Sequence, residues 1–254
     1  MNDNELERYS RQLLVPGFEL EGQEVLSSAS VLIVGCGGLG ALAAQYLAAA
    51  GIGHLALVDA DRIELSNLPR QIAYTEDDVG RFKAEVLAER LGRMNSAVRV
   101  THYPISFDEL SGASLVTAVD AVVDGTDNHA TRLLIDRFTA EKALPWFMGA
   151  AVQMAGQNIA FTGSREEGCY HCLAPQQTTE EAGGCATLGI LGPVVATVAL
   201  RQVLDVLGAL TGVAEVPWGM LRQYDFRADT TASLPLPMRA GCGVCDPDLK
   251  THSQ

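Results

Sequence analysis

The chain has 254 residues, of which 48 % are hydrophobic and 19 % charged, and this balance predicts one sizeable globular domain rather than a disordered chain. Its formal net charge of −13 argues against binding to nucleic acid, because phosphates require a basic surface. The polar N-terminus lacks the apolar run of a signal peptide, and no stretch approaches the length of a membrane helix, so we expect a cytoplasmic protein with reduced thiols.

The first predicted unit is a strand, a helix and a second strand. Residues Ser30–Val34 form a continuous apolar run rich in β-branched side chains, which is typical of a parallel strand buried on both faces. Apolar residues then recur at helical spacing from Leu39 to Ala50, and Gly51 ends the helix. Residues 55–59 read as the second strand. This βαβ unit predicts a right-handed crossover and a parallel sheet.

The alternation of strands and helices continues along the chain. We predict helices over 80–94, 109–117, 128–142 and 192–210, and strands over 98–101, 120–124, 157–161 and 221–226. From Trp146 onward the strands become shorter and the pattern less regular. The prediction is therefore an α/β fold with a doubly wound, Rossmann-like, mostly parallel sheet and a mixed C-terminal half.

A glycine-rich loop joins the first strand to its helix. Gly35-Cys-Gly-Gly-Leu-Gly40 matches G-x-G-x-x-G, and Asp59 ends the second strand. The glycines allow the backbone to approach phosphates at the helix N-terminus, while the carboxylate can accept hydrogen bonds from a ribose. This context predicts nucleotide binding but does not say which nucleotide is bound.

Two cations beyond Asp59 favour a triphosphate over a pyridine dinucleotide. Arg70 and Lys83 can offset charge on the β and γ phosphates as pyrophosphate leaves. A dehydrogenase has no obvious need for them. The alternative for either cation alone is a solvated surface charge.

The segment Asp124-Gly-Thr-Asp-Asn128 follows a predicted strand at its carboxyl end, where ligands bind in open α/β sheets. Asp127 could hold Mg²⁺ against the phosphates. Either Asp127 or Asn128 is also well suited to cap the next helix. Both interpretations can hold for different residues.

Two Cys-x-x-Cys pairs lie in the last third of the chain, Cys169/Cys172 and Cys242/Cys245. Each pair can direct two thiolates at one tetrahedral metal, and two pairs complete a four-sulfur zinc site that clamps the C-terminal half. Between the pairs, residues 176–184 are polar and end in two glycines, so we expect the least ordered stretch there. It leads directly into Cys185.

Together these motifs resemble the bacterial adenylyltransferases that activate ubiquitin-like sulfur-carrier proteins, the ThiF/MoeB/HesA family. The likeness spans about residues 6–245 and is carried by these motifs: Arg8-Tyr-Ser-Arg-Gln12, the glycine loop, Asp59-Ala-Asp61, Leu65-Ser-Asn-Leu-Pro-Arg-Gln71, Gly80-Arg-Phe-Lys83, Asp124-Gly-Thr-Asp-Asn128 and the cysteine pairs. Residues 17–24 and 149–157 look closer to the molybdopterin-synthase (MoeB) branch, with ThiF a near second. Pro69 and Phe82 depart from the family's usual glutamine and proline.

The resemblance implies roles for particular residues. The following match the family's ATP and Mg²⁺ positions: Gly38, Asp59, Ser66, Asn67, Arg70, Gln71, Lys83, Asp127 and Asn128. The following match its structural zinc ligands: Cys169, Cys172, Cys242 and Cys245. Arg11 matches an arginine that reaches into the neighbouring subunit, which implies a homodimer. Arg11, Arg70, Lys83, Asp127 and Cys185 form the implied catalytic set.

The implied domain, 1–254, has an N-terminal helical arm over 1–28, a nucleotide-binding half over 29–150 and a zinc-bearing, carrier-binding half over 151–250. In the implied reaction, the C-terminal glycine carboxylate of a carrier ending in Gly-Gly, the small subunit of molybdopterin synthase, attacks the α-phosphate of ATP. An acyl-adenylate and pyrophosphate result, which prepares the carrier for thiocarboxylation. Because a carboxylate is already ionised at pH 7, positioning and cations should suffice.

Cys185 matches an unligated cysteine that attacks the adenylate or handles sulfur, and a spectator thiol is the alternative. No rhodanese domain follows Cys245, so we expect an external sulfurtransferase. Three other interpretations stay open: the same chemistry on the thiamin-pathway carrier, an NAD-dependent oxidoreductase, and an inactive zinc scaffold that binds a carrier. The intact cations and Asp127 argue against the scaffold.

Overall fold

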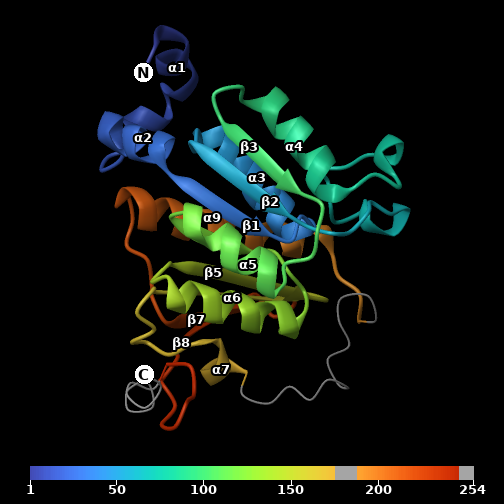
Figure 1. Ribbon diagram of the computed structural model, residues 1–254. Coiled ribbons are helices and arrows are strands. Elements are labelled where there is room, and N and C mark those ends of the chain that lie inside the picture. Colours follow the sequence, from blue (N-terminus) through green and yellow to red (C-terminus); the bar gives the residue numbers. More distant parts are fainter. Residues whose placement is uncertain (175–187, 246–254) are drawn as a thin grey trace.

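One eight-stranded sheet forms the centre of the computed structural model, which describes residues 1–174 and 188–245 (Figure 1). Its strands are β1 (Ser30–Val34), β2 (His54–Val58), β3 (Arg99–Tyr103), β4 (Ala121–Asp124), β5 (Trp146–Val152), β6 (Ala155–Phe161), β7 (Met220–Asp225) and β8 (Thr230–Pro235). They lie in the order β3-β2-β1-β4-β5-β6-β7-β8. Neighbours from β3 to β5 pair in parallel, and those from β5 to β8 pair antiparallel, so the predicted mixed sheet is confirmed.

Helices cover both faces of this sheet (Figure 1). The α-helices are α1 (Asp3–Tyr9), α2 (Glu19–Ser28), α3 (Gly38–Ala50), α4 (Lys83–Met94), α5 (Glu109–Leu115), α6 (His129–Glu141), α7 (Tyr170–Leu173) and α9 (Gly192–Thr211). Short 3₁₀ turns occur at η1 (Gln12–Leu14), η2 (Leu65–Asn67), η3 (Glu76–Asp78) and η4 (Val116–Ala118).

Strand β1 shows why the fold is doubly wound. Its side chains alternate between the faces, and both sets are buried, as the continuous apolar run predicts. Val31 and Ile33 belong to the core that also contains side chains of α3, α4 and α9. Leu32 and Val34 belong to the opposite core, which includes side chains of α6.

Most predicted elements are present with shifted ends. Helix α4 begins at Lys83 rather than at residue 80, because Gly80 has a φ of +89° and Phe82 is extended. The sequence reading missed β5 and β8. All six residues of β8 are exposed. Because neither face of β8 is buried, its sequence need not alternate apolar and polar residues, which is the pattern that marks a half-buried strand.

Helix α9 corrects one expectation. By length and composition alone this helix could cross a membrane. The prediction that no stretch approaches the length of a membrane helix was therefore wrong. In the structure it packs against α3 and the sheet, with Val198, Gln202 and Val206 buried. Its apolar character therefore fits a core helix of this domain.

The order of the strands determines where a ligand can bind. From β1 the chain crosses outward to β2 and β3 and then returns to β4 on the other side of β1. The connections that follow β1 and β4 therefore start at the carboxyl ends of adjacent parallel strands and lead to helices on opposite faces of the sheet, α3 and α6. Such a switch point leaves a crevice in doubly wound sheets.

Candidate nucleotide and metal sites

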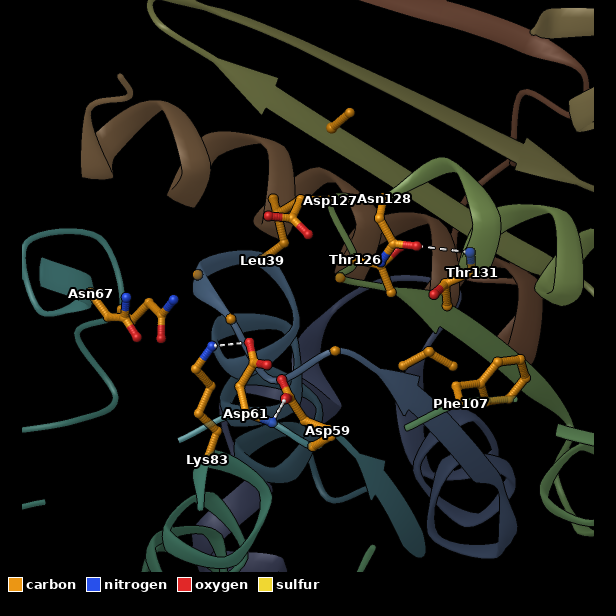
Figure 2. Close-up of a pocket in the computed structure, with 18 of the residues that line it drawn as sticks. Leu39, Asp59, Asp61, Asn67, Lys83, Phe107, Thr126, Asp127, Asn128 and Thr131 are labelled. Carbon is orange, nitrogen blue, oxygen red and sulfur yellow. Dashed lines mark hydrogen bonds and ion pairs between the residues drawn. The ribbon is translucent and has the colours of Figure 1, made fainter. Parts of the chain in front are cut away.

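A cavity of about 600 Å³ opens at this crevice, within the range of small-molecule sites (Figure 2). Eight of the nine residues predicted for the nucleotide line it: Gly38, Asp59, Asn67, Arg70, Gln71, Lys83, Asp127 and Asn128. Ser66 does not line the cavity, and its hydroxyl donates to Glu64 Oε2 at 3.2 Å. The structure therefore brings together residues that are far apart in the sequence.

Two glycines of the loop after β1 are required by close contacts. Gly35 has a φ of +86°, and a Cβ there would lie 2.9 Å from the carbonyl carbon of Gly125. A Cβ on Gly40 would lie 1.9 Å from the carbonyl oxygen of Gly35. Only glycine allows the loops after β1 and β4 to meet so closely at the start of α3.

Asp59 orders the glycine loop through its carboxylate. Oδ2 accepts a hydrogen bond from the Cys36 backbone N–H at 2.6 Å, and Oδ1 accepts one from the Asp61 N–H at 2.7 Å. Burial raises the pKa of Asp59 above its ordinary value, although Lys83 and these N–H groups oppose the rise. The sequence predicted only a contact of Asp59 with a ribose. In the structure Asp59 also orders the glycine loop.

Lys83 is buried at the edge of the cavity, and its ammonium is held in place. Nζ donates to Asp61 Oδ2 at 2.7 Å, and the Lys83 backbone N–H donates to the Asp61 carbonyl at 3.0 Å (Figure 2). The Tyr74 hydroxyl lies 2.7 Å from the Cys36 carbonyl oxygen and 3.3 Å from that of Lys83. The glycine loop and the start of α4 are therefore joined through one buried tyrosine.

Arg70 and Gln71 approach the cavity from the segment after η2. Arg70 Nη1 donates to the Ser66 carbonyl at 2.9 Å, which fixes the guanidinium at the cavity wall. Gln71 is buried, and its Oε1 has no hydrogen-bond partner in the part of the chain that the structure describes. A buried acceptor without a partner is costly, so this oxygen is available to a donor on a ligand.

The two interpretations of the Asp127-Asn128 pair apply to different residues. Asn128 Oδ1 accepts from the Thr131 N–H at 2.8 Å and so caps α6 (Figure 2). Asp127 is exposed and makes no hydrogen bond or ion pair within residues 1–174 and 188–245. Its carboxylate is therefore available for a cation or a ligand.

Arg132 is a cavity residue that the sequence reading missed. Its Nε donates to Asp124 Oδ2 at 3.1 Å, and its Nη2 donates to the carbonyls of Thr126 at 2.6 Å and Gly149 at 3.0 Å. Asp124 is fully buried, and burial raises its pKa. One feature of the sequence could have indicated this role. Arg132 lies one helical turn after Asn128, and this spacing places the Arg132 side chain next to the loop that precedes the helix.

Two predicted residues are not part of this cavity. Arg11 is exposed and does not line it. Cys185 lies outside the described residues, as does the stretch 176–184.

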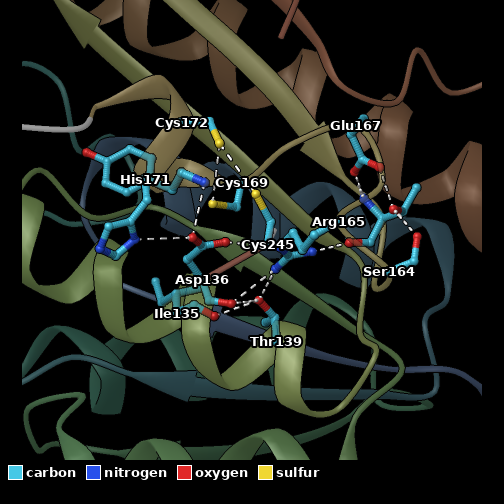
Figure 3. Close-up of polar contacts among 12 residues, drawn as sticks. Ile135, Asp136, Thr139, Ser164, Arg165, Glu167, Cys169, His171, Cys172 and Cys245 are labelled. Carbon is cyan, nitrogen blue, oxygen red and sulfur yellow. Dashed lines mark hydrogen bonds and ion pairs between the residues drawn. The ribbon is translucent and has the colours of Figure 1, made fainter. Parts of the chain in front are cut away.

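The four paired cysteines meet at a second site. Their sulfur atoms lie within 4.8 Å of one another. The separations are 3.9 Å for Cys169–Cys172 and 3.4 Å for Cys172–Cys245, which Figure 3 draws, and 3.6 Å for Cys169–Cys242. A tetrahedral metal with metal–sulfur bonds of about 2.3 Å has edges of about 3.8 Å. A disulfide would need about 2.05 Å. The cluster can therefore hold one metal ion.

Comparison with known proteins identifies the family of this chain. The ThiF family pattern matches residues 9–244. The chain is 41 % identical to the sulfur carrier protein ThiS adenylyltransferase of Escherichia coli over 96 % of this chain and 97 % of that protein. It is 36 % identical to the molybdopterin-synthase adenylyltransferase of the same species, over 96 % of this chain and 98 % of that protein.

A solved structure agrees with the fold. The crystal structure of E. coli MccB with ATP is 25 % identical, has a TM-score of 0.82 and covers 94 % of this chain and 74 % of its own. The family match and the two relatives each cover more than nine-tenths of the chain. The chain therefore belongs to the ThiF family and is an adenylyltransferase.

Proposed function

We propose that this enzyme uses ATP to adenylate the C-terminal glycine carboxylate of a ubiquitin-like sulfur-carrier protein ending in Gly-Gly. The observation that carries the proposal is the meeting of eight predicted nucleotide residues in one cavity, the cations Arg70 and Lys83 among them. Of the two E. coli relatives, one is named a sulfur carrier protein adenylyltransferase and the other a molybdopterin-synthase adenylyltransferase, which supports the proposal. An NAD-dependent oxidoreductase leaves the two cations and Asp127 unexplained.

In the proposed reaction, a carboxylate oxygen of the carrier forms a bond to the α-phosphorus. The bond from that phosphorus to the bridging oxygen of pyrophosphate breaks, and pyrophosphate leaves with the electron pair. The attacking carboxylate is already ionised, so no general base is required. Arg70 and Lys83 stabilise the charge that develops on the leaving group, with Lys83 shared between the phosphates and Asp61.

The residues present suit both expected metal ions. Asp127 offers an exposed carboxylate without a partner in the described ranges, at the mouth of a cavity sized for a nucleotide. Mg²⁺ held there would neutralise charge on the triphosphate. The four thiolates of the cysteine cluster match the preference of structural Zn²⁺ for a closed tetrahedral set.

The proposal includes a cytoplasmic homodimer in which Arg11 acts on the partner subunit. Arg11 is exposed and lies outside the cavity of its own chain, which is compatible with that role. Cys185 as a nucleophile, and a separate sulfurtransferase as the sulfur donor, also belong to the proposal. They rest on the resemblance alone.

The carrier itself has two candidates. Residues 17–24 and 149–157 led us to expect the small subunit of molybdopterin synthase. The higher identity to the ThiS adenylyltransferase, 41 % against 36 %, favours the thiamin-pathway carrier instead. Both must therefore be tested.

The experiment is exchange of labelled pyrophosphate into ATP, with Mg²⁺ and either purified carrier. We expect exchange that requires a carrier with an intact C-terminal Gly-Gly. The double variant Arg70→Ala, Lys83→Ala should lose at least about a hundredfold in exchange rate. Arg93→Ala, which removes an exposed cation of the same helix as Lys83, should leave the rate unchanged. Unchanged exchange in the double variant would reject the mechanism.

A further inference from the structure

Helix α6 connects the nucleotide cavity to the cysteine cluster. Its first residue, His129, directly follows Asp127 and Asn128, and its later turns pack against α7 (Tyr170–Leu173), which contains Cys172 and begins directly after Cys169. Two contacts fasten α6 to this cysteine turn, one at Asp136 in the middle of the helix and one at its first residue, His129. They have no part in the chemistry proposed above.

The first contact is a buried ion pair. Asp136 of α6 is fully buried, and its Oδ2 accepts from the Tyr170 N–H at 3.1 Å. Its Oδ1 accepts from Nε of the equally buried Arg165 at 3.0 Å (Figure 3). Arg165 has a φ of +59°, which a non-glycine residue adopts only when its surroundings enforce it. The pair therefore holds the loop before Cys169 against α6.

The second contact reaches the nucleotide cavity. The Tyr170 hydroxyl and His129 Nδ1 are joined by a hydrogen bond of 3.0 Å, and their ring centroids are 5.3 Å apart. Trp146 packs against the Tyr170 ring at 5.8 Å and limits its rotation. Both Tyr170 and His129 line the cavity, although Tyr170 follows a metal ligand.

Tyr170 therefore contacts α6 at two places. Its backbone N–H donates to the Asp136 carboxylate, and its hydroxyl is hydrogen-bonded to His129. Because Asn128 caps the turn that His129 begins, a shift of His129 would move the cap and the adjacent Asp127. We propose that Tyr170 is a positioning residue of the nucleotide site, whose hydroxyl fixes the first turn of α6 and hence the Asp127-Asn128 loop. This inference rests on the proposed use of that loop for ATP and Mg²⁺.

The test is the affinity for ATP with Mg²⁺, measured by calorimetry on the full, metal-replete chain without carrier. Tyr170→Phe removes only the hydroxyl and should weaken ATP binding about threefold to tenfold, the range expected for one hydrogen bond. The metal content per chain should stay unchanged. In pyrophosphate exchange, KM for ATP should rise while kcat at saturating ATP changes little.

His129 provides an independent variant. His129→Ala should weaken ATP binding no more than Tyr170→Phe does, because the Tyr170 hydroxyl also interacts with the Arg132 side chain. The double variant should be no worse than Tyr170→Phe alone, since both substitutions remove the bond between Tyr170 and His129. His129→Asn, whose amide can occupy the place of Nδ1, should restore most of the affinity. Tyr224→Phe removes a hydroxyl on β7 away from the cavity and should have no effect.

Unchanged ATP affinity in Tyr170→Phe, or in His129→Ala if the first variant does not fold, would overturn the inference while the proposed function stands. Loss of metal in Tyr170→Phe would also overturn it, because Tyr170 would then serve the cluster. Failure of the unsubstituted chain to bind ATP would overturn both.

Discussion

The parallel half of the sheet and the cysteine turn are stabilised in different ways. Strands β1, β2 and β4 are buried in continuous apolar cores. The loops that follow them are ordered by the Asp59 carboxylate, which accepts from the Cys36 N–H, and by Arg132, which donates to the Thr126 carbonyl. The cysteine turn has only a small cluster of its own, in which the sulfurs contact Leu236 and Val244. All residues of the adjacent strand β8 are exposed. Hydrophobic burial can therefore fold the first region, whereas we expect the second to depend on a metal ion held by its four cysteines.

Removal of the metal should produce the largest difference between the regions. With a chelator, hydrogen exchange of the backbone amides in 169–173 and 239–245 should accelerate on the order of a hundredfold or more. Without a shared metal ion, the four thiolates repel one another or bind water, and the segments that carry them separate. Strands β1 and β2 should keep their protection, as hydrogen-exchange mass spectrometry would measure. Equal acceleration throughout the chain would contradict the comparison.

Breaking the buried ion pair should have the next largest effect. Asp136→Asn leaves the Arg165 guanidinium buried without a counter-charge, and we expect a loss of about 3–5 kcal/mol in the free energy of unfolding. Urea denaturation would measure it. Glu141→Gln, which removes an exposed ion pair of 3.8 Å with Arg137 on the same helix, should cost less than about 1 kcal/mol. Similar losses in both variants would argue against a special role of the buried pair.

Two helix caps allow a smaller effect to be separated from simple stability. Asn128→Ala and Asp108→Ala each remove a cap, of α6 and α5 respectively, and each should cost about 1 kcal/mol in unfolding free energy. Only Asn128→Ala should also weaken ATP binding, because only that cap lies in the cavity lining. Calorimetry and urea denaturation on both variants would test this, and equal ATP affinities would contradict it.

The smallest expected effect is a pH dependence due to Asp59. Burial raises the pKa of Asp59, so ionised Asp59 opposes folding at neutral pH, and this penalty disappears as pH falls through the raised pKa. ATP affinity should change in the opposite direction. Protonation removes an acceptor from the ribose and from the Cys36 N–H, so ATP should bind more weakly as pH falls, starting at a higher pH than an ordinary aspartate would cause.

Asp59→Asn is the control for this dependence. An amide does not titrate, so ATP affinity in that variant should lose the part of the pH dependence that comes from Asp59. Calorimetric titrations at several pH values down to the stability limit of the protein would measure both proteins. An identical pH profile in the two would show that another group is responsible.

The sequence predicted the parts of the site that follow from local pattern. The apolar runs of β1 and β4 predicted buried parallel strands. The carboxyl ends of parallel strands lie at the same edge of a sheet, so the prediction placed the glycine loop and Asp127 close together, and both line the cavity. The choice between cap and ligand for Asn128 needed the observed 2.8 Å hydrogen bond, since both uses suit the same side chain.

The remaining features depend on contacts between distant segments. The hydrogen bond of Tyr170 to His129 joins residues from α7 and α6, and no spacing in the sequence signals it. The Lys83–Asp61 pair likewise arises from two chain segments that run side by side, with Arg62 bridged to Phe82. Strand β8 was missed because its pairing with β7, rather than burial of its own side chains, makes it a strand.

The Tyr74 hydroxyl has a further consequence for ligand binding. It donates to the Cys36 carbonyl at 2.7 Å and lies 3.3 Å from the Lys83 carbonyl oxygen, so the buried tyrosine sets the spacing between the glycine loop and α4 before any ligand is present. A binding site that is already ordered loses little conformational entropy when its ligand arrives. Contacts with the triphosphate can then contribute fully to its affinity and orientation, because little of their free energy is needed to order the two segments.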